Sequence, residues 1–249
     1  MTGVVREIPP YARLARHYDR LMDYIDYDEW VDVIHEVLKP YSPGKTWLDI
    51  SCGTGSMAVR LARQNHRMTI VDLSPDMIEV AREKAVGLDI KLDVGDMRTW
   101  QVDQRFDVVL NLHDGLNYLL DMSDLQQFMS NAHDLLNPGG VLLCDVATPL
   151  LCQRHFKGYH EMFADEQHSY ERTTEYAPHE RLAETMIRIY QDDRIIEVER
   201  HLQRAYDLTM IQSMVADSPF NEAVYLDDDS LETADEHTER ILLLLRRGP

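Results

Sequence analysis

The fold is decided by the stretch TWLDISCGTGS, residues Thr46–Ser56. Its apolar start, Thr46–Ile50, predicts a short strand, and a tight turn that contains Gly53 and Gly55 follows. The pattern of a helix comes directly after the turn. Glycine lets the backbone approach a ligand closely, and the first turn of a helix offers unpaired N–H groups. The stretch therefore predicts a binding corner for an anion or a nucleotide.

Three acidic residues narrow the choice of ligand, because the glycine spacing alone also fits the G-x-G-x-x-G/A fingerprint of dinucleotide-binding proteins. Asp49 lies inside the first strand, and Asp72 ends the second predicted strand, Met68–Asp72. A carboxylate at that place can accept hydrogen bonds from both hydroxyls of a ribose. Asp96 follows the third predicted strand, within the run Gly95-Asp96-Met97.

In the order and spacing of these motifs, the chain resembles the class I S-adenosylmethionine-dependent methyltransferases over roughly residues 11–150, and more weakly at the C-terminus. The matching segments are LDISCGTG (48–55), VDLSPDMIEVAREKA (71–85), GDM (95–97), FDVVLNLHDGLNYL (106–119) and LLNPGGVLLCDV (135–146). One position departs from the family, since Ser51 stands where glycine is usual. If that position needs a positive φ, serine would cost about 1 kcal/mol, and we expect an altered loop with the site retained.

The resemblance implies a binding site for S-adenosylmethionine. It implies that Asp72 binds the ribose hydroxyls, that Asp96 accepts from the adenine amino group and that Tyr18 lies over the cofactor. The loop amides and the helix start would face the methionine carboxylate. The residues expected at the cofactor are Tyr18, Asp49, Ser51, Gly53, Gly55, Asp72, Leu73, Met77, Asp96, Met97, Asn111 and Leu112.

The acceptor of the methyl group is expected beside the end of the fourth predicted strand, Phe106–Leu112. Ligands bind at the carboxyl edge of open α/β sheets, and His113 and Asp114 follow this strand directly. His113 is the candidate for the catalytic base because histidine titrates near neutral pH; a hydrogen-bonded structural histidine is the alternative. The residues expected at the acceptor are His113, Asp114, Asn117, Tyr118 and Tyr159.

The order of predicted elements indicates an α/β fold: a seven-stranded, mostly parallel, doubly wound sheet with an antiparallel closing hairpin, plus an inserted antiparallel β-sheet. The insert is predicted as strands over about 167–176, 181–191 and 195–205, and its position is similar to that in sugar-amine N-methyltransferases. A dehydrogenase sheet would end in parallel strands. The expected units are a helical lid (1–40), a cofactor-binding core (41–150), a cap or dimerisation sheet (151–206) and a C-terminal completion of the core sheet (207–249).

Several helices are expected around this sheet, and Ser74 is predicted as the N-cap of the one that follows the second strand. The segment Tyr11–Met22 predicts a helix of the lid. The apolar stripe of Asp28–Leu38 predicts a core-facing helix, with Trp30 in the core. The segment Ser123–Leu136 predicts a long helix that Ser123 and Gln126 begin as a capping box.

Composition excludes several classes of function. The formal net charge of −19 repels phosphate backbones, so no nucleic-acid partner is expected. No apolar run approaches the ~20 residues of a membrane span, and no secretory signal is recognisable, so we expect a cytoplasmic protein without a membrane partner. The three cysteines lack metal or disulfide spacing. No metal is expected, and the acidic run Asp227–Asp229 is interpreted as a solvated turn.

These observations predict an enzyme that transfers a methyl group by in-line displacement to a small-molecule acceptor, with an amine favoured. The inserted sheet could also form a homodimer contact. The alternatives are an RNA or protein methyltransferase, a protein that binds the cofactor without catalysis, and a nicotinamide-dependent oxidoreductase.

Overall fold

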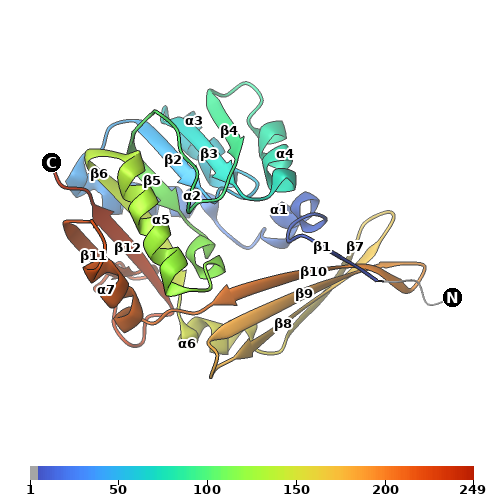
Figure 1. Ribbon diagram of the computed structural model, residues 1–249. Coiled ribbons are helices and arrows are strands. Elements are labelled where there is room, and N and C mark those ends of the chain that lie inside the picture. The colour runs from blue at the N-terminus through green and yellow to red at the C-terminus, as the bar shows by residue number, and fades with distance from the viewer. Residues whose placement is uncertain (1–4) are drawn as a thin grey trace.

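The structure, a computed structural model, describes residues 5–249 and consists of a core body and a long β-sheet that extends from it (Figure 1). The core is a seven-stranded sheet in the order β11-β12-β6-β5-β2-β3-β4, parallel from β6 to β4 and antiparallel at β12 and β11. Its strands are β2 (Thr46–Ile50), β3 (Arg67–Asp72), β4 (Ile90–Val94), β5 (Phe106–Asn111), β6 (Leu136–Ala147), β11 (Glu222–Asp227) and β12 (Arg240–Arg246). The predicted seven-stranded sheet with its closing hairpin is confirmed.

Helices cover both faces of the core sheet. One face packs against α2 (Tyr27–Leu38), α3 (Ser56–Arg63) and α4 (Pro75–Lys84), and the other packs against α5 (Met122–Leu135) and α7 (Leu208–Ala216). The inner strands β2, β3, β5, β6 and β12 are buried on both faces, which explains their nearly continuous apolar sequence. No helix within residues 5–249 is long and apolar enough to span a bilayer.

The second sheet, called sheet A here, has five strands in the order β1-β10-β9-β8-β7. They are β1 (Arg6–Ile8), β7 (Tyr159–Ala164), β8 (Ser169–Ala177), β9 (Leu182–Gln191) and β10 (Arg194–Arg204). The three predicted strands are confirmed, and β7 and β1 were missed. β1 is only three residues long and pairs in parallel with β10, almost two hundred positions away, so no local pattern could have indicated it.

Residues Arg6–Met22, called the strap here, cross from sheet A to the core. The prediction of one helix over Tyr11–Met22 is wrong. The strap contains β1, a turn in which Tyr11 has φ 67°, a short 3-10 helix η1 (Leu14–Arg16) and one helical turn, α1 (Tyr18–Leu21). A buried carboxylate holds this turn in place, because Glu199 of β10 accepts the backbone N–H groups of Tyr11, Arg13 and Leu14.

Short helical segments complete the chain: η2 (Lys39–Tyr41), η3 (Gly115–Tyr118), α6 (Pro149–Leu151) and the π-helix η4 (Cys152–Phe156). The expected N-cap of α4 is confirmed, since Ser74 accepts from the backbone N–H of Met77 at 3.2 Å. The capping box expected at Ser123 is wrong, because α5 already begins at Met122. Asp121 precedes that helix and makes no side-chain cap.

Candidate active site

The glycine turn forms one wall of a cavity of about 380 Å³ at the carboxyl edge of the core sheet, called the cofactor cavity here. Gly53 and Gly55 have φ of 52° and 73°, so both need the freedom of glycine. Ser51 does not have a positive φ. Serine at this position therefore carries none of the backbone strain that a positive φ would impose.

Asp72 holds the two loops of this cavity together. Its carboxylate accepts the backbone N–H of Gly53 at 2.9 Å and that of Ser74 at 2.9 Å. Asp49 lies behind it and is only 5% exposed. Burial, and then the charge of Asp72, raises the pKa of Asp49 to about 7. The floor of the cavity therefore contains one firmly placed carboxylate and one that titrates near neutrality.

Most of the residues predicted at the cofactor line this cavity. They are Tyr18, Asp49, Ser51, Gly53, Asp72, Leu73, Met77, Asp96, Met97 and Leu112. Two predicted residues do not line it. Gly55 packs against α4, where a Cβ would meet Ala81 at 3.1 Å. Asn111 is fully buried, and its amide donates to the carbonyl of Ile50 at 3.1 Å, so it braces two strands.

The donor and acceptor groups of the cavity fit an adenosine cofactor. Asp72 and Asp96 supply carboxylate oxygens for hydroxyl and amino groups, and the start of α3 supplies N–H groups. Asp96 is fixed by Arg98, whose guanidinium also contacts Asp124 at 2.8 Å. The hydroxyl of Ser51 is buried beside the cavity and has no hydrogen-bond partner among residues 5–249, which leaves a polar group for a ligand to satisfy.

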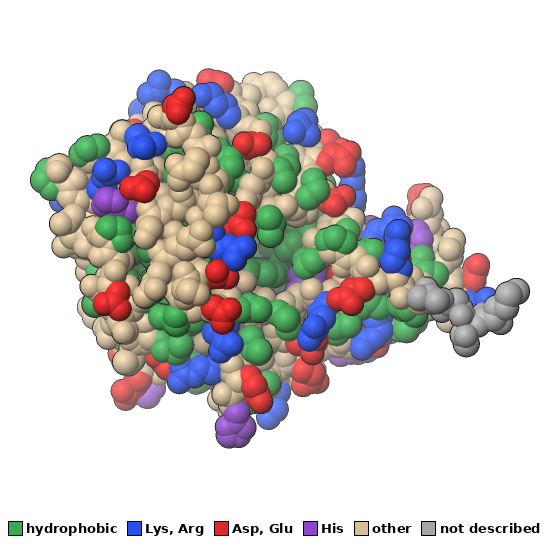
Figure 2. Space-filling view, viewed as in Figure 1, with side chains coloured by type: hydrophobic (Ala, Val, Ile, Leu, Met, Phe, Trp, Pro, Cys, Tyr) green, Lys and Arg blue, Asp and Glu red, His purple; other side chains and the backbone are tan. Residues whose placement is uncertain are grey.

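A second cavity of about 850 Å³, called the acceptor cavity here, lies between the strap, sheet A and the core. Figure 2 shows the hollow between the core and sheet A, where hydrophobic side chains lie among charged ones. Four side chains line both cavities: Tyr11, Tyr18, His113 and Tyr118. The two cavities therefore meet at these four residues, which we call the junction.

His113 sits at the junction in a left-handed conformation, with φ 60°. Its ring packs edge-on against Trp30 and Tyr27, with centroids 4.9 and 5.3 Å away. Burial, and then the charge of Arg240, lowers the pKa of His113 to about 4. Its Nε2 is buried without a hydrogen-bond partner among the described residues. Trp30, which was interpreted as a core residue, is partly buried against the core and also lines the acceptor cavity.

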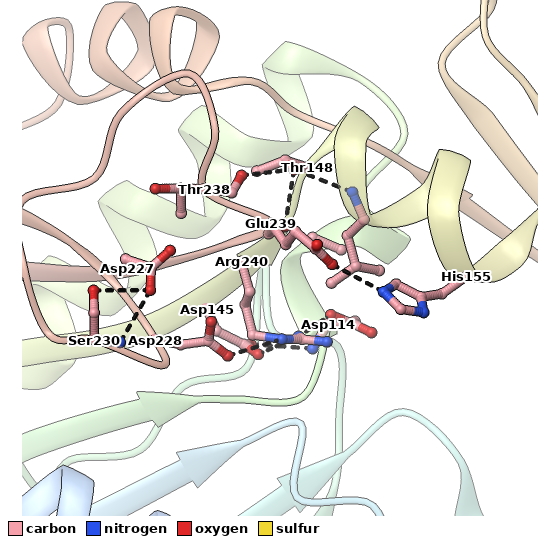
Figure 3. A network of polar contacts seen from close by, with 12 residues as sticks. Asp114, Asp145, Thr148, His155, Asp227, Asp228, Ser230, Thr238, Glu239 and Arg240 are labelled. Atoms are coloured by element: carbon pink, nitrogen blue, oxygen red, sulfur yellow. Dashed lines mark hydrogen bonds and ion pairs between the residues drawn. The ribbon is translucent and has the colours of Figure 1, made fainter.

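A cluster of charges forms the core side of the acceptor cavity (Figure 3). The Arg240 guanidinium contacts Asp114 and Asp145, and its Nε lies 3.4 Å from Asp228. Asp145 has no exposed side-chain surface. Burial raises the pKa of Asp228 to about 7, with Arg240 opposing the shift. The interpretation of Asp227–Asp229 as a solvated turn is therefore wrong for Asp228, whose side chain is 17% exposed and lines the cavity.

Not all of the residues predicted at the acceptor line the acceptor cavity. Asp114, Tyr118 and Tyr159 line the acceptor cavity, together with His113. Asn117 does not, because its amide binds the backbone of the insert and donates to the carbonyls of Ala147 and Arg204 at 3.0 and 2.7 Å. Its side chain is a clamp where the insert leaves and rejoins the core.

Sequence reasoning missed several residues that line the acceptor cavity: Tyr11, Asp228, His201 and Arg240. They come from the strap, the end of β11, β10 and the start of β12. None stands in a motif, and the pairing of distant strands brings them together. The sequence signal that could have indicated two of them is the arginine and the three consecutive acidic residues in the closing hairpin.

The comparisons with known proteins agree on one family. A family model described as a methyltransferase domain matches residues 48–140. A provisionally named methyltransferase of Geobacillus sp. (strain WCH70) is 30% identical over 245 residues, covering 95% of this chain and 99% of its own.

Solved structures agree as well. An S-adenosylmethionine-dependent methyltransferase from Clostridium acetobutylicum ATCC 824 is 25% identical, with a TM-score of 0.78 over 96% of this chain and 99% of that one. CalS10, an S-adenosylmethionine-bound amino pentose methyltransferase from Micromonospora echinaspora, shares the fold with a TM-score of 0.70 at 21% identity, over 95% and 98% of the two chains.

Proposed function

Because this chain belongs to the S-adenosylmethionine-dependent methyltransferases, we propose that it transfers a methyl group to the nitrogen of a small amine held in the acceptor cavity. The enzyme class and the cofactor follow from the family. Our proposal is that the acceptor is an amine, and the charged cluster around Arg240 is the observation that supports it.

Three carboxylates surround a single guanidinium in that cluster, namely Asp114, Asp145 and Asp228 around Arg240. With all of them ionised, the cluster has two negative charges in excess. Buried excess charge is unfavourable unless a counter-charge compensates it. A cationic amine in the acceptor cavity would supply that counter-charge, whereas a neutral alcohol or phenol would not.

Asp228 is the carboxylate with the loosest contact to Arg240, at 3.4 Å, and it lines the cavity. Because burial raises its pKa to about 7, it is only partly ionised at neutral pH. A bound ammonium favours the ionised form of a neighbouring carboxylate. We therefore assign Asp228 to the binding of the amine.

S-adenosylmethionine, when bound, supplies a methyl group on a positively charged sulfur that is already activated for displacement. Tyr11 and Tyr18 of the strap line the cofactor cavity beside the junction. Orientation of two reactants can supply on the order of 7–11 kcal/mol. His113 is neutral at pH 7 because its pKa is about 4, so its unpartnered Nε2 can accept a hydrogen bond from the amine and orient the nitrogen. A protonated imidazole could not accept this bond.

The test is a transfer assay with radiolabelled S-adenosylmethionine and matched pairs of acceptors, each an amine and the alcohol of the same skeleton. Amino sugars, polyamines and amino acid amides form the panel. We expect methylation of amines, with N-methyl products identified by mass spectrometry. Methylation of the alcohols, with the amines inert, would overturn the proposal.

The carboxylate assignment is tested with Asp228→Asn. For a cationic acceptor, KM in the wild type should fall as the pH rises from 6 to 8, because Asp228 ionises across this range. Loss of one charge-assisted hydrogen bond, about 1.5–2 kcal/mol, should raise KM roughly 10- to 30-fold at pH 8 and flatten its pH dependence. Asp229→Asn is the matched control, since Asp229 is exposed.

A further inference from the structure

A chain of four polar side chains leads from the junction into sheet A. The hydroxyls of Tyr11 and Tyr118 are hydrogen-bonded to each other. The Tyr118 hydroxyl lies 3.1 Å from Nδ1 of His201, and Nε2 of His201 lies 3.3 Å from Glu199. His201 is 3% exposed and Glu199 is 0% exposed. The chain therefore begins where the two cavities meet and ends at a carboxylate away from solvent.

The partners of Glu199 fix the direction of these hydrogen bonds. Its carboxylate accepts three backbone N–H groups of the strap, so both of its oxygens act as acceptors. An ionised carboxylate only accepts, so Nε2 of His201 carries the proton and donates it. Nδ1 of His201 then has a free lone pair, to which Tyr118 donates, and Tyr11 donates to Tyr118. The oxygen of Tyr11 is left to accept a hydrogen bond at the junction.

An amine needs such an acceptor for its proton. Most alkylamines are protonated at neutral pH, and an ammonium has no lone pair with which to attack. His113 cannot retain the proton at pH 7, because burial lowers its pKa to about 4. Burial raises the pKa of both Tyr11 and Tyr118, so these phenols keep a proton and can pass one on without ionising.

We propose that Tyr11 and Tyr118 relay the proton of the acceptor ammonium to His201, which holds it next to Glu199. This inference rests on the proposed amine acceptor. His201 acts through Tyr118 and is therefore a positioning and proton-holding residue.

The proton balance is complete within these groups. The N–H bond of the ammonium breaks, its electron pair stays on nitrogen and the proton passes to the oxygen of Tyr11. The hydroxyl proton of Tyr11 moves to Tyr118, and that of Tyr118 moves to Nδ1 of His201. The nitrogen lone pair forms the new N–C bond, and the electron pair of the broken C–S bond stays on the cofactor sulfur. His201 ends as an imidazolium paired with the Glu199 carboxylate.

The surroundings of His201 contain few other charges. From the strap, Tyr11 packs edge-on against its ring at 4.7 Å, and Arg13 is bound to Glu197 at 2.7 Å. From η3 comes Tyr118, and from β10 itself come Glu197 and Glu199. On β9, the residues paired with His201 and Glu199 are the uncharged Thr185 and Ile187. Glu199 is therefore the carboxylate in direct contact with this imidazole.

The decisive experiment is ¹⁵N NMR of histidine-labelled full-length protein bound to S-adenosylhomocysteine, with the His201 signals identified from their loss in His201→Gln. We expect a proton on Nε2 and a hydrogen-bonded lone pair on Nδ1 at pH 7. In Tyr118→Phe the Nδ1 signal should move to the position of a free lone pair. In the control Tyr190→Phe, whose hydroxyl binds Glu171, the His201 signals should stay in place. A proton on Nδ1, or an Nδ1 signal unaffected by Tyr118→Phe, would overturn the relay.

This measurement needs no acceptor, so it decides the relay separately from the amine panel. With an amine that the panel identifies, His201→Gln should lower kcat about 10- to 100-fold at pH 7 and leave the affinity for S-adenosylhomocysteine within twofold. The loss of kcat should shrink at higher pH, where the free amine needs no proton acceptor. A loss that is the same at every pH would indicate a purely structural histidine and would also overturn the relay.

Discussion

The cofactor cavity and the acceptor cavity share four side chains at the junction, yet they are built from different parts of the chain. The cofactor cavity is lined mainly by the ends of three neighbouring parallel strands, such as Asp49, Asp72 and Asp96, with a cover from the strap. The acceptor cavity combines the strap, the insert and the closing hairpin. The comparison teaches that the cofactor half depends on local loop geometry, whereas the acceptor half depends on contacts between distant segments.

The largest expected effect is a loss of stability from a substitution in the acceptor half. Arg240→Met would leave the fully buried Asp145 and the partly buried Asp114 without a cation, which should lower the free energy of unfolding by about 3–5 kcal/mol. Arg246→Met, on the same strand, is the control, because Arg246 is 46% exposed and lies 3.6 Å from Glu222; it should cost under ~1 kcal/mol. Urea denaturation measures both. Equal effects would mean that the acceptor half does not depend on this cluster.

The corresponding change in the cofactor half should alter binding. Asp72→Ala removes the expected ribose ligand together with the acceptor of the Gly53 and Ser74 N–H groups. The loss of about 3 kcal/mol should raise the Kd for S-adenosylhomocysteine roughly 100-fold, measured by titration calorimetry. Asp89→Ala, at an exposed site between α4 and β4, should leave the Kd unchanged. A change within twofold for Asp72→Ala would show that Asp72 is not the ribose ligand.

The junction itself can be tested by pH. The pKa of His113 is lowered in the folded protein from 6.5 to about 4, so the unfolded chain takes up a proton first as the pH falls. The contribution of a neutral His113 to stability is full above pH 6.5 and is lost between pH 6.5 and pH 4. At pH 5 the loss should be about 2 kcal/mol.

The difference in unfolding free energy between the wild type and His113→Gln should change by that amount between pH 7.5 and pH 5. His237→Gln is the control, because His237 is 81% exposed, and its difference should stay constant. An equal pH response of the two variants would mean that water reaches the His113 ring and that burial does not lower its pKa.

The smallest expected effect concerns the strap, which serves both halves. Glu199 lines neither cavity, but it holds the strap that supplies Tyr11 and Tyr18 to the junction. Glu199→Gln should weaken the binding of S-adenosylhomocysteine about tenfold, a loss of ~1.4 kcal/mol in binding free energy. Glu197→Gln affects only the side chains of Arg6 and Arg13 and should change the Kd less than threefold. If the two variants bind equally, the backbone contacts of Glu199 do not hold the strap in place.

The same contrast explains how far the sequence could be interpreted. Strand ends, glycine turns and the Ser74 cap are set by neighbours in the chain, so the core sheet could be predicted, and ten of the twelve residues expected at the cofactor line one cavity. Gly55 and Asn111 do not line it, and in sequence glycine freedom and strand bracing give the same local pattern as ligand contact.

The acceptor half could not be predicted in this way. Arg240 meets Asp114 and Asp145 only because β12 pairs antiparallel with β6. His201 meets Tyr118 only because β10 passes beside η3. The residues that meet in these contacts lie too far apart in the sequence for a local pattern to connect them. The predicted helix over Tyr11–Met22 failed for a similar reason, since Glu199 of the distant strand β10 binds the turn at Tyr11, whose positive φ is not helical.

The clamp at Asn117 has a consequence for how such proteins diversify. The insert leaves the core after Ala147 and returns at Tyr206, and the two points touch through a backbone contact of 3.4 Å. A segment whose ends lie side by side can be exchanged between genes as one block. Here the block has a second attachment, because β10 carries β1 and the strap. A recombination event that replaced residues 148–205 alone would separate a cap from the N-terminus that fits it. Acceptor preference and N-terminal sequence should therefore be inherited together, although most of the core lies between them in the gene.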